Sequence, residues 1–158
     1  MKGLWALLLL AAMSLVPGEA AAQRRDRGVL KGPLEAGPRI GRDFENKAWS
    51  VGGQAAALVG RNLELRPSGD LFFPRDEGMG WQLNGDAAIR FGNGGLYAGG
   101  GIAVVKPDDS DTETGYNLFF GLSTAAPNEP TKGFLEFRWT FLDDTSPFRL
   151  ALGFLYRL

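Results

Sequence analysis

The stretch FRLALGFLYRL, residues 148–158, ends the chain and alternates strictly between two kinds of side chain. One face carries only apolar residues: Phe148, Leu150, Leu152, Phe154, Tyr156 and Leu158. The other face mixes arginine with small or aliphatic residues: Arg149, Ala151, Gly153, Leu155 and Arg157. A period of two indicates a β-strand whose two faces meet different surroundings. The apolar row therefore either fills a closed core or faces lipid.

Residues 1–22 have the pattern of a secretory signal. Lys2 carries a positive charge, and the apolar run 4–16 is shorter than the roughly 20 residues that a membrane-spanning helix needs. Three alanines at 20–22 provide a cleavage site, with an uncleaved anchor as the alternative. The sequence therefore predicts export. Residues 23–37, basic at first and then rich in glycine and proline, are expected to form a flexible periplasmic leader.

The composition excludes several classes of protein. The chain has no cysteine, so an exported domain has to be stable without disulfides, as a barrel with a closed hydrogen-bond ladder is. It also has no histidine, which removes the commonest general base and, with cysteine absent, most zinc ligands. A net charge of −1 gives no electrostatic footprint for nucleic acid. We expect no enzymatic activity, no cofactor, no metal and no nucleic-acid partner.

From residue 38 onward, strand-length segments alternate with turn residues, and no helical period is sustained. Most segments have about 10 to 13 residues, close to the roughly 9–11 that a tilted strand needs to cross a bilayer. The first segment is the least regular. We retain it because seven strands would be an odd number, which single-chain bacterial barrels avoid. The predicted strands are 38–44, 48–59, 62–73, 79–91, 95–105, 114–123, 133–142 and 147–158.

Three connections indicate whether consecutive segments keep their apolar residues on the same face of the sheet. Asn93-Gly94 is a two-residue hairpin signal that puts Phe91 and Leu96 on the same face. Residues 60–62 suit a three-residue connection that keeps the flanking apolar residues in phase. Pro67 removes a ladder donor from the third segment. A turn there would split the segment, but a bulge or kink is favoured because the apolar parity continues through it.

The charged rows face either water, as in a soluble lipocalin-like barrel that binds an apolar ligand, or a confined lumen, as in a membrane barrel. Strand interiors use arginine rather than lysine, which favours forked arginine–carboxylate pairs in a lumen. The polar rows also hold the small residues that a narrow lumen needs: Gly52, Ala56, Ala88, Gly121, Ala151 and Gly153. Aromatic residues near segment ends fit girdles at the two membrane interfaces: Trp49, Trp81, Tyr116, Trp139 and Tyr156. We therefore predict an all-β, eight-stranded antiparallel up-and-down transmembrane β-barrel over residues 38–158.

Nine charged residues share the predicted lumen face: Glu64, Arg66, Asp70, Asp86, Arg90, Glu136, Arg138, Arg149 and Arg157. An arginine that faced lipid near the midplane would cost roughly 2–4 kcal/mol, so we place all five arginines inside. The interior of an eight-stranded barrel is just wide enough for side chains to fill it. We expect ion pairs to plug the lumen and leave no large pore, with Glu136, Arg138 and Arg149 as the first partners. The turn argument puts Tyr97 on this face too.

The terminal segment ALGFLYRL, residues 151–158, carries a resemblance to a known family. It is similar to the C-terminal assembly signal of small outer-membrane β-barrel proteins of Gram-negative-type bacteria, the OmpA/OmpX type. Gly153 is followed by hydrophobic residues at the third-last and last positions, Tyr156 and Leu158, although the family often ends in phenylalanine. The resemblance implies a monomer in the outer membrane with porin-like architecture, and its implied partners are outer-membrane lipids and the insertion machinery. It identifies no particular function, so a structural or envelope-associated role is expected.

Two other chemistries have weaker support. The acidic run Asp108, Asp109, Asp111 and Glu113 resembles a calcium loop, but Thr114 stands where glycine is needed, so a solvated external loop is favoured. Some barrels of the resembled family modify lipids with histidine and serine, a route that this chain lacks. Asp70 and Asp86 could in principle act as an acid–base pair, although charge pairing is favoured. With periplasmic termini, the external loops are expected near 45–47, 74–78, 106–113 and 143–146.

Overall fold

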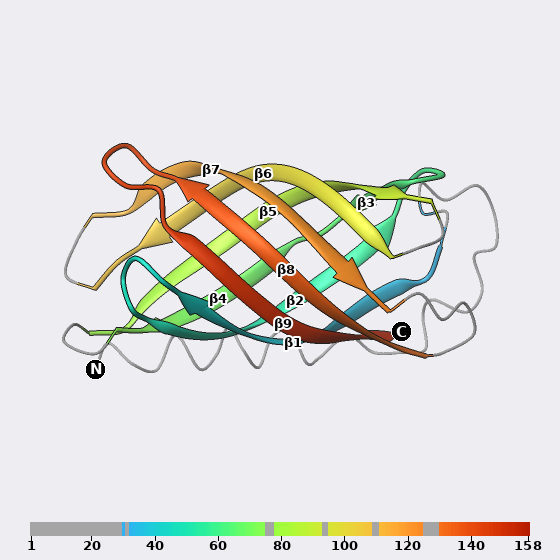
Figure 1. Cartoon of the computed structure of the whole chain (residues 1–158), viewed down its shortest axis with the longest axis horizontal. Helices are drawn as coiled ribbons and strands as arrows, with labels where there is room; N and C mark the ends of the chain where they lie inside the picture. Colours follow the sequence, from blue (N-terminus) through green and yellow to red (C-terminus); the bar gives the residue numbers. More distant parts are fainter. Residues whose placement is uncertain (1–29, 31, 75–77, 93–94, 109–110, 125–129) are drawn as a thin grey trace.

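The computed structural model describes residues 30, 32–74, 78–92, 95–108, 111–124 and 130–158. These residues form one antiparallel sheet that closes on itself as a barrel (Figure 1). Among them, no helix is long and apolar enough to span a membrane. The strand segments are β1 (Leu34–Asp43), β2 (Trp49–Leu58), β3 (Leu63–Leu65), β4 (Ser68–Phe73), β5 (Gly80–Phe91), β6 (Leu96–Lys106), β7 (Glu113–Ser123), β8 (Thr131–Phe141) and β9 (Phe148–Arg157).

The barrel closes where its first and last strands meet. Each strand pairs with its neighbours in sequence, and β9 also pairs with β1 from Glu35 opposite Arg157 to Asp43 opposite Arg149. The last residue extends this seam, because the Leu158 amide donates to the Leu34 carbonyl at 2.8 Å. Closure leaves no unpaired edge, which is the condition for a sheet to lie in a bilayer.

β3 and β4 are two parts of a single strand, which makes eight strands in all. Both parts pair with β2 and with β5, and the register is the same before and after the break at Arg66 and Pro67. No residue is inserted, so a turn and a bulge are both wrong, whereas the predicted continuity of the apolar parity through Pro67 is confirmed. A kink at Pro67 stays a prediction. The strand is interrupted because proline has no amide hydrogen to donate. The interruption stays local because the Pro67 carbonyl still accepts from the Ala55 amide at 2.9 Å.

The predicted strands agree with the structure in number and phase, with one boundary corrected. β1 begins at Leu34, so residues 34–37 belong to the barrel and not to a flexible leader. Phe91 stands opposite Leu96 on the outer face, as the hairpin argument predicts, although Asn93-Gly94 itself lies outside the described residues. The predicted signal at 1–22 and the rest of the leader also lie outside them, apart from Leu30 and residues 32–33.

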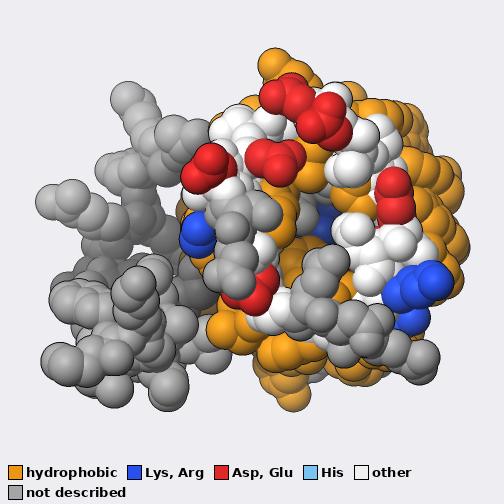
Figure 2. Space-filling view, turned by 90° about the vertical axis from the view of Figure 1, so that its left-hand side faces the viewer, with side chains coloured by type: hydrophobic (Ala, Val, Ile, Leu, Met, Phe, Trp, Pro, Cys, Tyr) orange, Lys and Arg blue, Asp and Glu red, His pale blue; other side chains and the backbone are white. Residues whose placement is uncertain are grey.

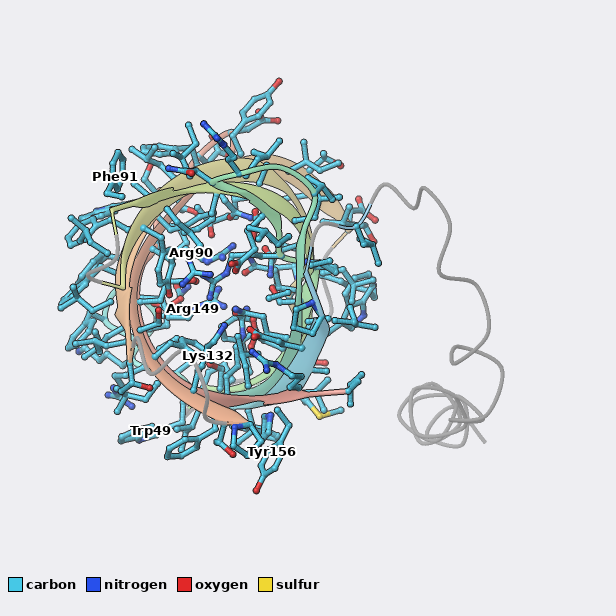
Figure 3. All side chains as sticks on the ribbon, turned by 90° about the vertical axis from the view of Figure 1, so that its right-hand side faces the viewer. Trp49, Arg90, Phe91, Lys132, Arg149 and Tyr156 are labelled. Carbon is cyan, nitrogen blue, oxygen red and sulfur yellow. The ribbon has the colours of Figure 1, made fainter. Side chains whose placement is uncertain are left out.

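The apolar rows cover the outer wall, and the polar rows fill the inside. Leu83, Ile102, Leu118 and Phe154 are each more than half exposed, whereas Glu136 in the neighbouring inward row is fully buried. Seen end-on, hydrophobic side chains form the outer wall in Figure 2, and Arg90, Lys132 and Arg149 point into the barrel in Figure 3. This arrangement is the inverse of a soluble lipocalin-like barrel, so that alternative does not fit the fold.

The two ends of the barrel differ in what they carry. At the loop end, on the left of Figure 1, β1, β4, β6 and β8 end and β2, β5, β7 and β9 begin. At the terminal end, β1 begins and the chain reaches its C-terminus. Acidic side chains gather on the loop end in Figure 2, and the exposed ones there include Glu45, Asp108, Asp111, Asp143 and Asp144.

Candidate functional site: the lumen charge network

Nine charged side chains form one connected set of ion pairs in the barrel interior, which we call the lumen network. It contains five arginines and four carboxylates from β1, β3, β4, β5, β8 and β9 and from the β3–β4 break. Its members are Arg39, Glu64, Arg66, Asp70, Asp86, Arg90, Glu136, Arg138 and Arg149. Strand alternation brings these residues inside, and closure of the barrel brings them together.

Glu136 is the centre of the lumen network. Its Oε1 accepts hydrogen bonds from Nε and Nη2 of Arg138, at 3.1 and 2.8 Å. Arg39 and Arg66 approach the same carboxylate at 3.8 Å, and the Tyr97 hydroxyl donates to Oε2 at 3.2 Å. The Glu136 side chain has no exposed surface, so three cations and one phenol take the place of water around it.

A second centre lies at Asp70 on β4. Arg39 donates to it through two guanidinium nitrogens, with Nε at 2.8 Å from Oδ1. Arg149 donates through Nη1 at 2.8 Å and reaches the Gln82 amide oxygen with Nη2 at 2.5 Å. Arg138 and Arg149 are cross-strand neighbours, and their like charges are tolerable because each has its own carboxylate.

Inward aromatic rings cover the flat faces of three arginines. The guanidinium carbon of Arg66 lies 3.9 Å from the centre of the Tyr97 ring. Arg138 lies over Phe119 at 4.7 Å, and Arg149 lies over Phe72 at 4.3 Å. A cation over an aromatic face is attracted to it, and the contact keeps water off the guanidinium plane. The aromatic residues in the polar rows are thus part of the lumen packing.

Glycine makes room for these large side chains. Gly121 stands opposite Tyr97 across the β6–β7 pair. A Cβ at position 121 would lie 2.4 Å from the Tyr97 hydroxyl oxygen and 2.6 Å from the Leu135 carbonyl oxygen. Only glycine therefore lets the Tyr97 ring lie flat against β7, where it meets Arg66 and Glu136.

A layer of uncharged polar side chains fills the lumen between the network and the loop end. Asn117 donates to Asn84 at 2.8 Å and to Asp86 at 3.0 Å, and it accepts from Thr140 at 2.9 Å. Gln82 donates to Asn84 at 2.6 Å. The four uncharged side chains are buried, and so is Asp86 of the lumen network. The polar layer ties β5, β7 and β8 together across the lumen.

The structure places the nine predicted lumen residues unequally. Eight of them are in the lumen network, and seven of these are buried; Arg90 is 30% exposed near the terminal end. Arg157 differs: in the part of the chain that the structure describes, it is exposed and forms no ion pair. It stands near the end of β9, where the inward row has already reached the rim. Its assignment to the network is therefore corrected.

Sequence reasoning missed Arg39, which is the fifth arginine of the lumen network in place of Arg157. The residue lies in the first predicted segment, and its outward neighbours include Arg42, which obscures the alternation there. Alternation from Arg39 through Gly41 to Asp43 could have identified the inward row. Glu35 and Lys132 were missed as well; they form an ion pair at the terminal mouth of the lumen, 2.5 Å apart.

The predicted aromatic girdle lies on the outer surface, and the predicted assembly signal has residues on both faces. Trp49, Trp81, Tyr116 and Trp139 stand in outward rows toward the loop end, whereas Tyr156 stands at the terminal end with 56% of its surface exposed. Of the predicted assembly signal, Leu158 is exposed and Gly153 faces the Phe134 ring inside. The described residues contain no cluster of three or more acidic side chains placed to hold a metal ion, and Asp109 of the acidic run lies outside them.

Solved structures of other β-barrels share this fold. The structure is similar to the N-terminal β-barrel domain of Pseudomonas aeruginosa OprF, with a TM-score of 0.66, 22% identity, and coverage of 79% of this chain and 96% of that one. The chain has the fold of an outer-membrane β-barrel. It is also similar to a structure from the de novo design of transmembrane β-barrels and to the de novo designed protein TMB2.3, each at 15% identity, with TM-scores of 0.55 and 0.54 and coverage of 80% of this chain. They are covered over 96% and 94% of their lengths. By sequence alone, no family model and no curated protein matches.

Proposed function

We propose that the protein is a non-enzymatic structural component of the outer membrane, a barrel whose lumen is plugged by its own charged side chains. The observation that supports this proposal is the burial of the lumen network. Glu136, Arg138, Arg39 and Asp70 come from three sides of the lumen, and each has at most 4% of its surface exposed. A standing water channel would expose these groups.

The energetics favour a closed lumen over an open one. Every arginine of the lumen network has a carboxylate within 4.0 Å, and three also lie over aromatic rings. Opening a channel would have to separate several of these pairs at once, because they share Glu136 and Asp70. We expect the folded barrel to fill its own lumen at rest and to hold its diameter rigidly.

Planar-bilayer recording tests the closed lumen. Purified wild-type monomer should give no large, steady conductance, while a variant with Arg39→Ala, Arg138→Ala and Arg149→Ala should leak more ions if it folds. Heat-modified gel mobility identifies the folded fraction of each sample. A large, steady conductance from the folded wild-type monomer would overturn the plugged lumen.

Location in the outer membrane is tested separately, by fractionation of cells that produce the full-length chain. We expect recovery with the outer membrane and release only by detergent, because the outer wall is apolar over its whole circumference. We also propose that the insertion machinery recognises the segment from Gly153 to Leu158, which lies on the closing strand β9. Recovery in the soluble periplasm would overturn the membrane location.

A further inference from the structure

Charged residues are nearly absent from the outward rows of the barrel. The outward positions of the eight strands hold only two, Arg42 near the end of β1 and Lys106 at the end of β6. Both are cations, and both lie at the loop end. All the other strand positions on the outer wall are uncharged, as a lipid-facing surface requires. The two exceptions both stand at strand ends on the loop side and therefore call for a common reason.

Each of the two cations stands directly opposite a tryptophan on the neighbouring strand. Arg42 pairs with Trp49 across β1 and β2, and Lys106 pairs with Trp81 across β5 and β6. Tryptophan prefers the depth of the lipid headgroups, where its ring is half apolar and half wet. The two pairs thus place both cations at the level of the headgroups.

The Arg42 guanidinium has one side covered and, within the part of the chain that the structure describes, no anionic partner. Its central carbon lies 5.1 Å from the centre of the Trp49 ring, and Trp49 is itself 56% exposed on the outer wall. None of the ion pairs between described residues includes Arg42. In the lumen, by contrast, every arginine of the network has a carboxylate. The stacking orients the Arg42 fork on the lipid side without satisfying its charge.

We propose that Arg42 and Trp49 form a binding site for the phosphate of an anionic lipid headgroup. A guanidinium presents paired donors that match phosphate oxygens, and the indole packs against the start of the acyl chain. This inference rests on the proposed membrane location.

Quenching of Trp49 fluorescence by brominated lipid tests the site. The Trp81→Phe, Trp139→Phe background leaves Trp49 as the reporter in the mature barrel, which is folded into vesicles of equal parts phosphatidylglycerol and phosphatidylcholine. Bromine is placed on the chains of one lipid or the other. We expect Trp49 to contact the anionic lipid about fivefold more often than phosphatidylcholine, because one cation near a membrane surface favours anionic lipid by about 1 kcal/mol. Arg42→Gln should remove this preference.

The matched control is Arg157→Gln, which removes an exposed arginine from the inward row at the opposite end. It should leave the preference unchanged. Equal quenching by both lipids in the unsubstituted protein, or an unchanged preference in Arg42→Gln, would overturn the site. Loss of the preference on adding millimolar inorganic phosphate would also overturn it, since a free ion would then be the ligand. Failure of the barrel to enter any vesicle would instead contradict the membrane location.

Discussion

Glu136→Gln is the sharpest test of the lumen network, because it removes one charge and almost no volume. Glutamine can still accept from Arg138, but the carboxylate that three arginines share disappears. The network then holds five arginines and three carboxylates. Removing one partner of a buried ion pair typically costs about 3–5 kcal/mol, because the remaining charge is left uncompensated.

The contacts that survive place the expected loss at the lower end of that range. Arg138 keeps Asp86 at 2.7 Å, Arg66 keeps Glu64 at 3.3 Å, and Arg39 keeps Asp70. No arginine is left without a carboxylate, so we expect a decrease of about 3 kcal/mol in the free energy of unfolding. Reversible urea unfolding of the barrel in lipid vesicles, followed by tryptophan fluorescence, measures this difference.

Glu35→Gln is the matched control, since it makes the same change in a pair at the terminal mouth. Its partner Lys132 is 15% exposed, so we expect a loss of about 1 kcal/mol or less. Adding Arg66→Gln to Glu136→Gln restores the original charge balance and should cost less than the two single changes summed. Equal losses for Glu136→Gln and Glu35→Gln would refute the central place of Glu136.

Three further predictions concern the closing strand, the packing and the outer wall. Tyr156→Asp should reduce insertion in cells more than it reduces stability after refolding in detergent, because it damages the proposed assembly signal; normal insertion would contradict that proposal. Gly121→Val should cost about 1–3 kcal/mol in unfolding experiments through its clash with Tyr97, whereas Gly133→Val, whose nearest side-chain atoms would be 3.7 Å away, should cost less. Leu118 lies midway along β7 in its outward row, so Leu118→Arg should lower the free energy of unfolding in vesicles by about 2–4 kcal/mol. An unaltered unfolding midpoint would mean that this face does not meet lipid.

Outside the first strand, the direction of the strand residues, inward or outward, could be predicted from the sequence alone. Alternation is a local property of the extended backbone, so the apolar row from Phe148 to Leu158 already placed Arg149 on the opposite face. The phase also survived Pro67, because a missing amide hydrogen removes one hydrogen bond and does not change the register. The charged rows could be placed inside the barrel because an arginine side chain that faced lipid would cost free energy.

Only the tertiary structure decided which charges meet. Arg39 and Asp70 are 31 residues apart and stand on strands separated by β2, and Arg149 joins them from β9. Such contacts depend on strand tilt, on the register around the closed barrel and on which rings fill the lumen. The same geometry leaves Arg157 at the rim, although its row is inward, because β9 reaches the end of the barrel there. Depth along the barrel axis is set by pairing with distant strands, and period-two alternation carries no information about it.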